Sequence, residues 1–355
     1  MDFTKGLTDV ELSILREMWP SHDLTRNALE RALEHSRPTV TKAMRTLEEQ
    51  GFVVREGKSP PPRGRPAETF HIRGEAWSAL GIDFEMPDVD VVLINARGER
   101  LNSAHFATSR EVGDSRDILE TASREIRTWL DSVGTSRPCA VGVGFPGYFS
   151  NGELSLAGRN MPDWRQVPVR AHLERTLQVP IFVGHDVHFM ALAEVEHRGW
   201  DDDVVLYLAL RPGLLDGVRV GACLVVRGRP YLGGRGNGGA LFRAIVPPEA
   251  LVGAEQEVRS ERIAEQLASS LVHLIPMADP DHVVFHGGPI GSLEPLVISH
   301  CERMLRDAFH GEYIGAAEIS PALVRGTSGA ERAAVAATRE LLTQRGLGFV
   351  TEKGG

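Results

Sequence analysis

Residues 36–51 read SRPTVTKAMRTLEEQG, and this stretch decides the fold of the start of the chain. Ser36 suits a helix N-cap, where its side-chain oxygen would accept a hydrogen bond from a free amide of the first turn. Pro38 is tolerated in that turn because its missing N–H is not needed there. Gly51 fits the left-handed position that follows a helix. Apolar residues recur between these ends at helical spacing and predict one buried face, formed by Val40, Met44 and Leu47.

The other side of this predicted helix carries short polar and basic residues. Threonine and arginine side chains can reach base edges in the major groove of DNA, and lysine and arginine also neutralise phosphates. We therefore expect a DNA-recognition helix, with these candidate contact residues: Arg37, Thr39, Thr41, Lys42 and Arg45.

The elements around this helix complete a helix-turn-helix with a wing. A shorter helix is predicted over Thr25–Leu33, and two strands, Phe52–Arg55 and Thr69–Ile72, flank a proline-rich loop. The order helix, helix, strand, loop, strand is typical of winged DNA-binding domains. The alternative is an ordinary solvated helix followed by a proline-rich linker. The loop adds three candidate DNA contacts: Arg63, Gly64 and Arg65.

The charge of this region differs in sign from that of the whole chain. Between His35 and Arg73, two lysines and six arginines stand against four glutamates, a local charge of +4, whereas the chain of 355 residues carries −9. A basic patch on an acidic protein is a localised electrostatic footprint. It predicts double-stranded DNA as a partner rather than general adhesion to polyanions.

Length and composition indicate a soluble globular protein of two or three domains. Hydrophobic residues make up 42% of the sequence and charged residues 25%. No apolar run approaches the roughly 20 residues that cross a bilayer, and Met1–Leu7 lacks the apolar core of a signal peptide. We therefore expect a cytoplasmic protein with no membrane partner. The cysteines are widely separated, which favours reduced structural thiols: Cys139, Cys223 and Cys301.

Beyond Arg73 the pattern predicts an α/β body. Three strands followed by alternating helices and strands occur twice, which indicates two related lobes with ligand loops at strand ends. We divide the chain into residues 1–78, a winged helix-turn-helix domain that a helix over Asp9–Trp19 completes, and residues 79–355, the two-lobed body. The body strands are expected at Trp77–Phe84, Val89–Asn95, Leu101–Ala107, Ala140–Gly144, Ile181–Val183, Val204–Leu210, Arg219–Val226, Pro230–Leu232 and His282–His286, and the helices at Ser115–Val133, Arg170–Leu177, Val187–Arg198, Ser260–Met277, Gly291–Phe309 and Ser328–Gly346.

Several motifs of the chain resemble the ROK family, whose name joins repressors, open reading frames and sugar kinases. The match is best to the winged-helix transcriptional repressors of that family, and it extends over residues 8–346. In the first domain it rests on residues 36–41, 47–53 and 64–66. In the body it rests on VGVGFPG at 141–147, NMPDW at 160–164 and VGHD at 183–186.

The resemblance implies an actin-like, ribonuclease-H-like body with a hexose pocket between its lobes. In the sugar kinases of the family, an Asn–Asp pair after a short strand contacts the sugar, and its Asp is the base for the attacking hydroxyl. Here the matching pair is His185–Asp186, so Asp186 is a vestigial base candidate. The alternative for Asp186 is the N-cap of the following helix. The resemblance implies these ligand-binding residues: Gly144, Gly147, Asn160, His185, Asp186 and Arg243.

The chain departs from the family pattern where the kinases bind ATP. Bare backbone amides must approach the phosphates, which requires glycine-rich loops. The first loop should follow Asp83, but residues 84–88 read FEMPD, and the carboxylates there would repel phosphate. The second should follow Leu210, but residues 211–216 read RPGLLD. Only the pair at 287–288 resembles a family glycine motif, with a simple turn as the alternative. We therefore do not expect an enzyme.

The zinc motif of the family is altered as well. Its Gly-Glu-x-Gly-His stretch corresponds to GALFR at 239–243, and no cysteine lies between Cys223 and Cys301, so neither a metal nor another cofactor is expected. The same change removes a Glu and a His that contact sugar hydroxyls in the family. Arg243 and His185 would instead favour an anionic ligand, such as a sugar phosphate or a sugar acid. The alternative is an Arg243 paired with a nearby acid.

Three functions follow from this pattern. The first is a DNA-binding transcriptional regulator, in particular a repressor, that binds a palindromic operator as a homodimer or tetramer and responds to a sugar or a sugar derivative. The second is a sugar kinase with a DNA-binding head. The third is a regulator whose body is a dimerisation scaffold without a ligand. The intact basic helix and the altered phosphate loops favour the first.

Overall fold

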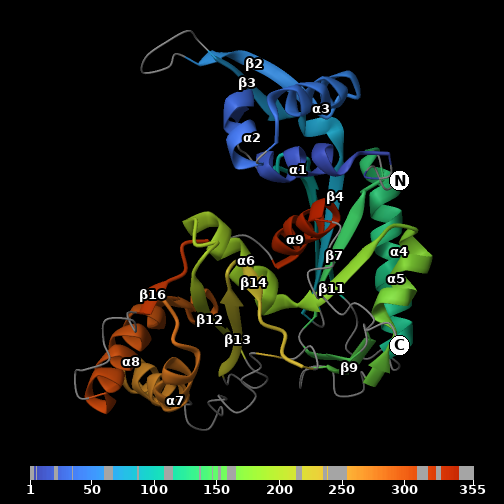
Figure 1. The fold of residues 1–355 in the computed structure, drawn as a ribbon. Helices are drawn as coiled ribbons and strands as arrows, with labels where there is room; N and C mark the ends of the chain where they lie inside the picture. Colours follow the sequence, from blue (N-terminus) through green and yellow to red (C-terminus); the bar gives the residue numbers. More distant parts are fainter. Residues whose placement is uncertain are drawn as a thin grey trace.

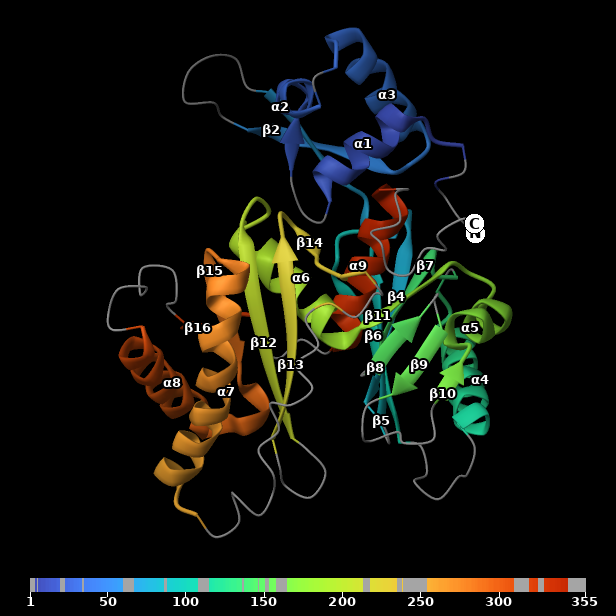
Figure 2. The same cartoon turned by 60° about the horizontal axis from the view of Figure 1, so that its bottom comes forward.

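A computed structural model of the chain describes residues 4, 6–19, 23–33, 35–59, 67–85, 88–107, 115–135, 137–145, 147–150, 153–157, 165–212, 218–234, 238, 254–309, 319–324 and 329–343. Figures 1 and 2 show a small N-terminal head above a body of two lobes. Within these ranges no helix combines the length and the apolar character needed to cross a membrane.

The head is a three-helix unit with a small sheet, as the sequence predicts. Its elements are α1 (Asp9–Met18), β1 (Leu24–Thr25), α2 (Arg26–Ala32), α3 (Arg37–Glu49), β2 (Val53–Ser59) and β3 (Ala67–Ile72), and the strand order is β1-β3-β2. A capping box starts α1, in which Thr8 and Glu11 exchange hydrogen bonds between side chain and backbone N–H. The three apolar residues predicted for α3 are all fully buried: Val40, Met44 and Leu47.

The two ends of α3 confirm one expectation and correct another. Gly51 follows the helix with φ +77°, the left-handed conformation expected of it. Ser36 occupies the N-cap position but makes no capping hydrogen bond to the backbone. Its hydroxyl instead lies 2.8 Å from the hydroxyl of Thr39, one turn later. The predicted capping role of the Ser36 side chain is therefore wrong, because a neighbouring hydroxyl competes for it.

The body contains two five-stranded sheets of the same topology, which confirms the prediction of two related lobes. The strand orders are β11-β7-β4-β5-β6 and β14-β13-β12-β15-β16. In each sheet the first strand of the lobe pairs antiparallel with the second strand and parallel with the fourth. The first lobe comprises β4 (Ser78–Glu85), β5 (Asp88–Asn95), β6 (Arg100–Ala107), α4 (Ser115–Val133), β7 (Ala140–Phe145), α5 (Val169–Leu177) and β11 (Ile181–His185). The second comprises β12 (Val204–Pro212), β13 (Val218–Val226), β14 (Arg229–Pro230), α7 (Gln256–Ala278), β15 (His282–His286), α8 (Glu294–Ala308) and β16 (Ile319–Pro321).

Some elements differ from the expected ones. A small sheet in the order β10-β9-β8 was not predicted, nor was β16; its strands are β8 (Gly147–Ser150), β9 (Glu153–Ala157) and β10 (Arg165–Val167). The α-helix expected over Gly291–Phe309 begins only at Glu294 of α8. Gly291 lies inside the 3-10 helix η4 (Gly288–Leu293), where its backbone is non-helical (φ 56°, ψ −122°). The cysteines are free and buried, as expected. Burial raises the pKa of the Cys223 thiol, which keeps it protonated.

Two helices cross between the lobes. α6 (Asp186–Arg198) follows the last strand of the first sheet and packs on β12, β13 and β15 of the second. α9 (Gly329–Thr343) follows the last strand of the second sheet and packs on β4 and β5 of the first. Both lie between the two sheets (Figure 1), whereas α4 and α5 cover the outer face of the first sheet and α7 and α8 that of the second.

The helix α9 lies directly on the backbone of the first sheet. A methyl group on Gly81 of β4 would lie 1.6 Å from the carbonyl oxygen of Ala330, and one on Gly142 of β7 would lie 1.9 Å from that of Ala333. No side chain larger than hydrogen fits at either glycine without displacing the helix. The far end of α9 enters the core of the head, where Ala337, Leu341 and Leu342 belong to the same apolar cluster as the residues of α1 and α3. One helix therefore contacts both the sheet and the head.

Candidate functional site

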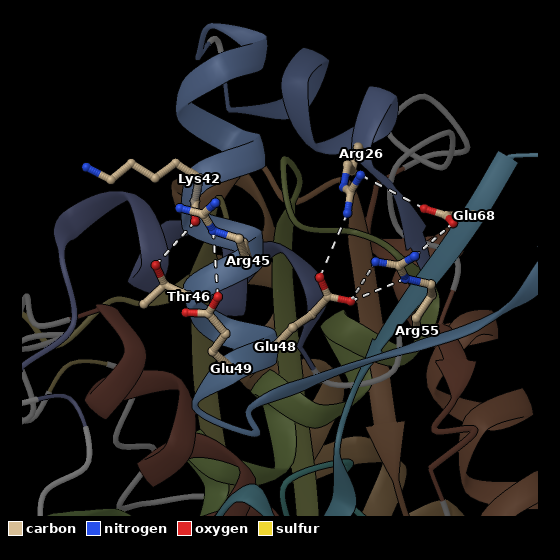
Figure 3. A network of polar contacts seen from close by, with 8 residues as sticks. All are labelled: Arg26, Lys42, Arg45, Thr46, Glu48, Glu49, Arg55 and Glu68. Carbon is tan, nitrogen blue, oxygen red and sulfur yellow. Dashed lines mark hydrogen bonds and ion pairs between the residues drawn. The ribbon is translucent and has the colours of Figure 1, made fainter.

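The predicted recognition face of α3 is exposed. Arg37, Thr39, Thr41, Lys42 and Arg45 are all open to solvent, while Val40, Ala43, Met44 and Leu47 on the opposite side are buried in the head. Figure 3 shows Lys42 extending from α3 on the side away from the wing strands. The structure thus brings the five predicted residues of α3 together on one surface.

Single, long ion pairs occupy the arginines of this face. The Arg37 guanidinium lies 3.8 Å from the carboxylate of Glu30, and that of Arg45 lies 3.7 Å from Glu49. The two arginine side chains are 79% and 70% exposed, so these contacts are weak. Lys42 has no carboxylate partner within the described part of the chain. Its ammonium is available to a phosphate without breaking an ion pair.

A network with more contacts per arginine lies beside this face, between α3 and the wing strands. We call it the Arg/Glu network; its members are Arg26 of α2, Glu48 of α3, Arg55 of β2 and Glu68 of β3. The Arg55 guanidinium lies 2.9 Å from Glu68 and 3.4 Å from Glu48, and that of Arg26 lies 3.8 Å from Glu48 and 3.9 Å from Glu68. Each cation therefore faces both anions, as Figure 3 shows.

An aromatic ring completes the network. The guanidinium carbons of Arg26 and Arg55 lie 4.8 Å and 5.7 Å from the centre of the buried Phe70 ring, within the range of cation–π attraction. The hydrogen bond and the charge of Glu48, followed by the charge of Glu68, raise the pKa of Arg55 above its ordinary value. Sequence reasoning counted Arg55 in the basic patch and did not single out Arg26. Net charge alone does not reveal such pairing.

The second candidate site lies where three parallel strands of the first sheet end. Asp83, Gly144 and His185 lie at or near the carboxyl ends of β4, β7 and β11, and Asp83 is directly opposite Gly144 in the register. A methyl group on Gly144 would lie 3.2 Å from Asp83 Oδ1 and 3.5 Å from the Asp186 Cβ. The two carboxylates, on residues that are 7% and 4% exposed, thus flank bare backbone. With His188 these residues form the strand-end cluster.

The start of α6 fixes the position of Asp186. The N-cap of this helix is His185, and Asp186 is its first residue, so the N-cap alternative for Asp186 is wrong. Asp186 Oδ1 accepts a hydrogen bond of 2.7 Å from the Val187 N–H and lies 3.6 Å from His185 Nδ1. The carboxylate therefore lies at the positive end of a helix.

His188 is a buried, uncharged member of this cluster. Its ring lies 5.3 Å from that of His185, and the residue is 2% exposed. Burial, together with the nearby His185, lowers the pKa of His188 to about 3, although Asp186 and a backbone hydrogen bond at Gly238 act in the opposite direction. The imidazole is neutral at physiological pH. The cluster therefore presents two carboxylates and a neutral ring. Sequence reasoning did not identify His188, because a histidine inside an apolar helix gives no signal of its own.

The start of α9 touches the same cluster. A methyl group on Gly329, the first residue of α9, would lie 2.0 Å from Asp83 Oδ2. Asp83 therefore contacts Gly144 on one side and α9 on the other. In the sequence analysis, Asp83 was only the residue after which a phosphate loop would be expected.

Several predicted residues lie outside the described ranges. These are the wing residues Arg63, Gly64 and Arg65, the ligand candidates Asn160 and Arg243, and the stretches 86–87, 213–217 and 239–253. Gly147 is described, and it is the buried first residue of β8. Gly287, which starts the glycine pair, donates its N–H to Glu294 Oε1 at 2.9 Å.

Comparison with known families assigns the two parts of the chain. A model described as ROK family matches residues 79–254, which contain the whole strand-end cluster. The body of the chain is a ROK family domain. A model of the MarR family matches residues 5–64, so the ROK body follows a MarR-type winged helix. The fold class predicted from the sequence is confirmed.

Three similar proteins carry names with different functions. The putative xylose repressor of Caldicellulosiruptor sp. (strain Rt8B.4) is 23% identical over 273 residues, which cover 74% of this chain and 66% of that repressor. This chain thus spans slightly less than two thirds of that relative. The crystal structure of a ROK family transcriptional regulator, a homolog of the E. coli MLC protein, has a TM-score of 0.74 at 15% identity and covers 97% of this chain and 98% of its own. The N-acetyl-D-glucosamine kinase of Salmonella arizonae is 33% identical over 112 residues, 32% of this chain and 35% of that kinase.

Proposed function

We propose that this ROK protein is a DNA-binding transcriptional repressor whose affinity for its operator depends on a sugar. The exposed polar and basic face of α3, on a winged helix, carries the proposal. Such a face offers hydrogen-bond donors and acceptors to base edges and cations to phosphates. The names of the similar repressor and regulator support the same function.

We propose a homo-oligomer, at least a dimer, as the DNA-binding form. One winged helix contacts too little DNA for a specific site, and a two-fold dimer doubles the contacts over two half-sites. The net charge of −9 supports the view that DNA approaches only the basic heads. In this proposal the contacts come from Arg37, Thr39, Thr41, Lys42 and Arg45, with Arg63, Gly64 and Arg65 in the wing.

We propose the strand-end cluster as the sugar site. Its two buried carboxyl groups offer hydrogen-bond acceptor oxygens, so they favour a ligand rich in hydroxyl donors. This supports a neutral sugar over the sugar phosphate or sugar acid that the sequence suggested. The name of the similar repressor makes D-xylose the first candidate. Gly144 and Gly147 would admit the ligand, while His185 and Asp186 would bind it, together with Asn160 and Arg243.

We propose α9 as the route from sugar to DNA. Its first residue touches Asp83 of the sugar site, and its last turn packs in the core of the head. A ligand that moves Asp83 would therefore act on the element that supports α1 and α3, which is what coupling between two sites requires. The division of the chain after residue 78 stays a proposal, because the two domains share this core.

We also propose that the body transfers no phosphate. A sugar kinase is the competing function, and both the retained Asp186 and the similar N-acetyl-D-glucosamine kinase favour it. The bulky, acidic residues at 84–88 in place of a glycine-rich loop argue against it. Release of ADP from ATP in the presence of a hexose and a pentose panel, abolished by Asp186→Ala, would establish the kinase instead.

Gel-shift titration at fixed salt tests the proposed repressor. A duplex is first selected by the wild-type protein from a random pool, and binding to it is then compared for the triple variant Arg37→Ala, Lys42→Ala, Arg45→Ala. We expect the triple variant to bind at least ~100-fold more weakly, since each lost phosphate or base contact costs from about threefold to about tenfold. Arg306→Ala, which removes one exposed arginine of α8, is the control for loss of a surface cation outside the head. Equal binding by the triple variant would refute the head assignment.

The same titration with D-xylose tests the sugar. We expect the sugar to weaken DNA binding by the wild-type protein and to have no effect on Asp186→Asn. A sugar response that survives in Asp186→Asn would place the ligand elsewhere, and no response to any sugar would leave the body as a dimerisation scaffold.

A further inference from the structure

The Arg/Glu network differs from the ion pairs on the predicted recognition face in the number of contacts that each arginine makes. Arg37 and Arg45 each face one carboxylate at 3.7 Å or more and are mostly exposed. Arg55 faces two carboxylates at 2.9 Å and 3.4 Å, and Arg26 faces the same two at 3.8 Å and 3.9 Å. Both also lie over the Phe70 ring, and they are 49% and 30% exposed. The first pair of arginines can leave their partners for a phosphate easily. The second pair is held.

The network lies where a DNA backbone would pass. Arg26 is the first residue of α2, the helix that crosses the backbone in helix-turn-helix complexes. Arg55 lies on β2, which leads toward the wing, and Glu48 lies on α3 one residue before Glu49, the partner of Arg45. Figure 3 shows the four side chains together on the wing side of α3. Phosphates beside α3 would therefore compete with Glu48 and Glu68 for the two guanidinium groups.

Keeping Arg26 and Arg55 in ion pairs has a defined effect on the affinity for DNA. The sequence-independent part of protein–DNA affinity grows with the number of phosphates that cations neutralise. A cation held by carboxylates adds little to that part, and the carboxylates themselves repel the backbone. Specificity is the difference between operator and non-operator affinity, so lowering the non-operator term raises it.

We propose that Glu48 and Glu68 hold Arg26 and Arg55 away from the DNA backbone, and that this restraint limits binding to non-operator DNA. The inference rests on the proposed function of the head and adds four residues to it. Arg26 and Arg55 are then cations that contact phosphate only when they separate from these carboxylates. Glu48 and Glu68 determine specificity without touching a base.

The double variant Glu48→Gln, Glu68→Gln tests the restraint, because glutamine keeps the shape and removes the charge. Affinity for a random-sequence duplex is measured from about 50 to 200 mM salt, beside affinity for the selected operator. We expect random-duplex affinity to rise about tenfold at the low-salt end and the slope of log affinity against log salt to steepen by up to ~1.8, about 0.9 for each released arginine. Operator affinity should change less, so the specificity ratio falls.

Two further variants separate the restraint from charge and from folding. Glu17→Gln removes one negative charge from the exposed side of α1 and should leave the slope unchanged. Adding Arg26→Ala and Arg55→Ala to the double variant should restore the wild-type slope. The single variants Glu48→Gln and Glu68→Gln should each steepen the slope by a smaller amount, and they serve if the double variant does not fold.

Three results would overturn the proposal. A double variant with the wild-type slope would show that the arginines stay away from phosphates without their carboxylates. A parallel loss of operator and random-duplex affinity would show that the network only holds the wing in place. In both cases the wild-type protein still binds its operator and the proposed function stands. Failure of the wild-type protein to bind any duplex would refute both proposals together.

Discussion

The predicted recognition face of α3 and the strand-end cluster are opposite in charge and burial, although one helix, α9, contacts the surroundings of both. The first is exposed and basic, and its arginines make only long, single ion pairs. The second is buried, carries Asp83 and Asp186, and includes a histidine whose pKa is lowered to about 3. An exposed cationic surface suits a large polyanion that brings its own charge. A buried acidic cluster suits a small hydroxyl-rich molecule that must leave water to bind.

The largest effect is expected where both regions depend on α9. In Gly81→Ala the new methyl group would meet backbone atoms of Ala330 and Ala334, so no side-chain rotation relieves the overlap and the helix must move. We expect the free energy of unfolding, measured by urea titration, to fall by about 3 kcal/mol. Operator affinity should fall as well, because α9 contributes to the head core.

Gly234→Ala is the matched control for that substitution. Nothing lies within 4 Å of a methyl group at Gly234, and we expect wild-type stability and DNA binding. A stable Gly81→Ala protein with full operator affinity would contradict the role of α9 as a link. A stable protein that binds DNA but no longer responds to the sugar would sharpen it.

A smaller effect is expected from pH, and only in the body. Because the pKa of His188 is lowered from 6.5 to about 3, the unfolded chain takes up a proton at a higher pH than the folded one. The contribution of His188 to the free energy of unfolding is complete above pH 6.5 and declines as the pH falls toward 3. Between about pH 6.5 and 5 the loss should be about 2 kcal/mol, measured as a shift in the urea transition.

Substitution identifies the residue responsible. His188→Gln should flatten this slope, leaving the smaller part that comes from His172, whose pKa burial and Arg175 also lower. Burial would raise the pKa of Glu194, but hydrogen bonds from Leu323, Val324 and Arg198 lower it, so its contribution is lost only at pH values below this window. His273→Gln, on the exposed side of α7, should keep the full slope. A His188→Gln protein with the wild-type dependence of stability on pH would mean that the cluster is hydrated.

The sequence predicts those elements whose residues follow a periodic pattern along the chain. The α3 helix was predicted correctly because one buried face, Val40, Met44 and Leu47, produces a periodic signal. The paired lobes were predicted from the repeated order of elements. The short strands β8–β10 and β16 were missed because three to five residues carry too little pattern.

Contacts between distant segments were not predictable from the sequence. The close approach of α9 requires glycine at 81 and 142. This helix lies almost 200 residues or more further along the chain, and nothing beside either glycine in the sequence reveals the contact. Arg55 and Glu68 were counted as charges, but whether they pair depends on the β2–β3 register. Residues that form a periodic buried face were therefore predicted, and residues that meet only through tertiary packing were not.

The smallest expected effect distinguishes two cations on the same helix face. Lys42→Ala should weaken operator binding about tenfold and reduce the salt slope by about 0.9, because its ammonium meets phosphate without first leaving a described partner. Arg45→Ala should weaken it only ~3-fold, because the native Arg45 must separate from Glu49 to bind, and its loss also ends that competition. Glu49→Gln should therefore raise operator affinity in the wild-type background and have a smaller effect beside Arg45→Ala. Equal losses for Lys42→Ala and Arg45→Ala, with no coupling between Arg45 and Glu49, would show that single surface ion pairs do not tune this interface and would leave restraint to the Arg/Glu network alone.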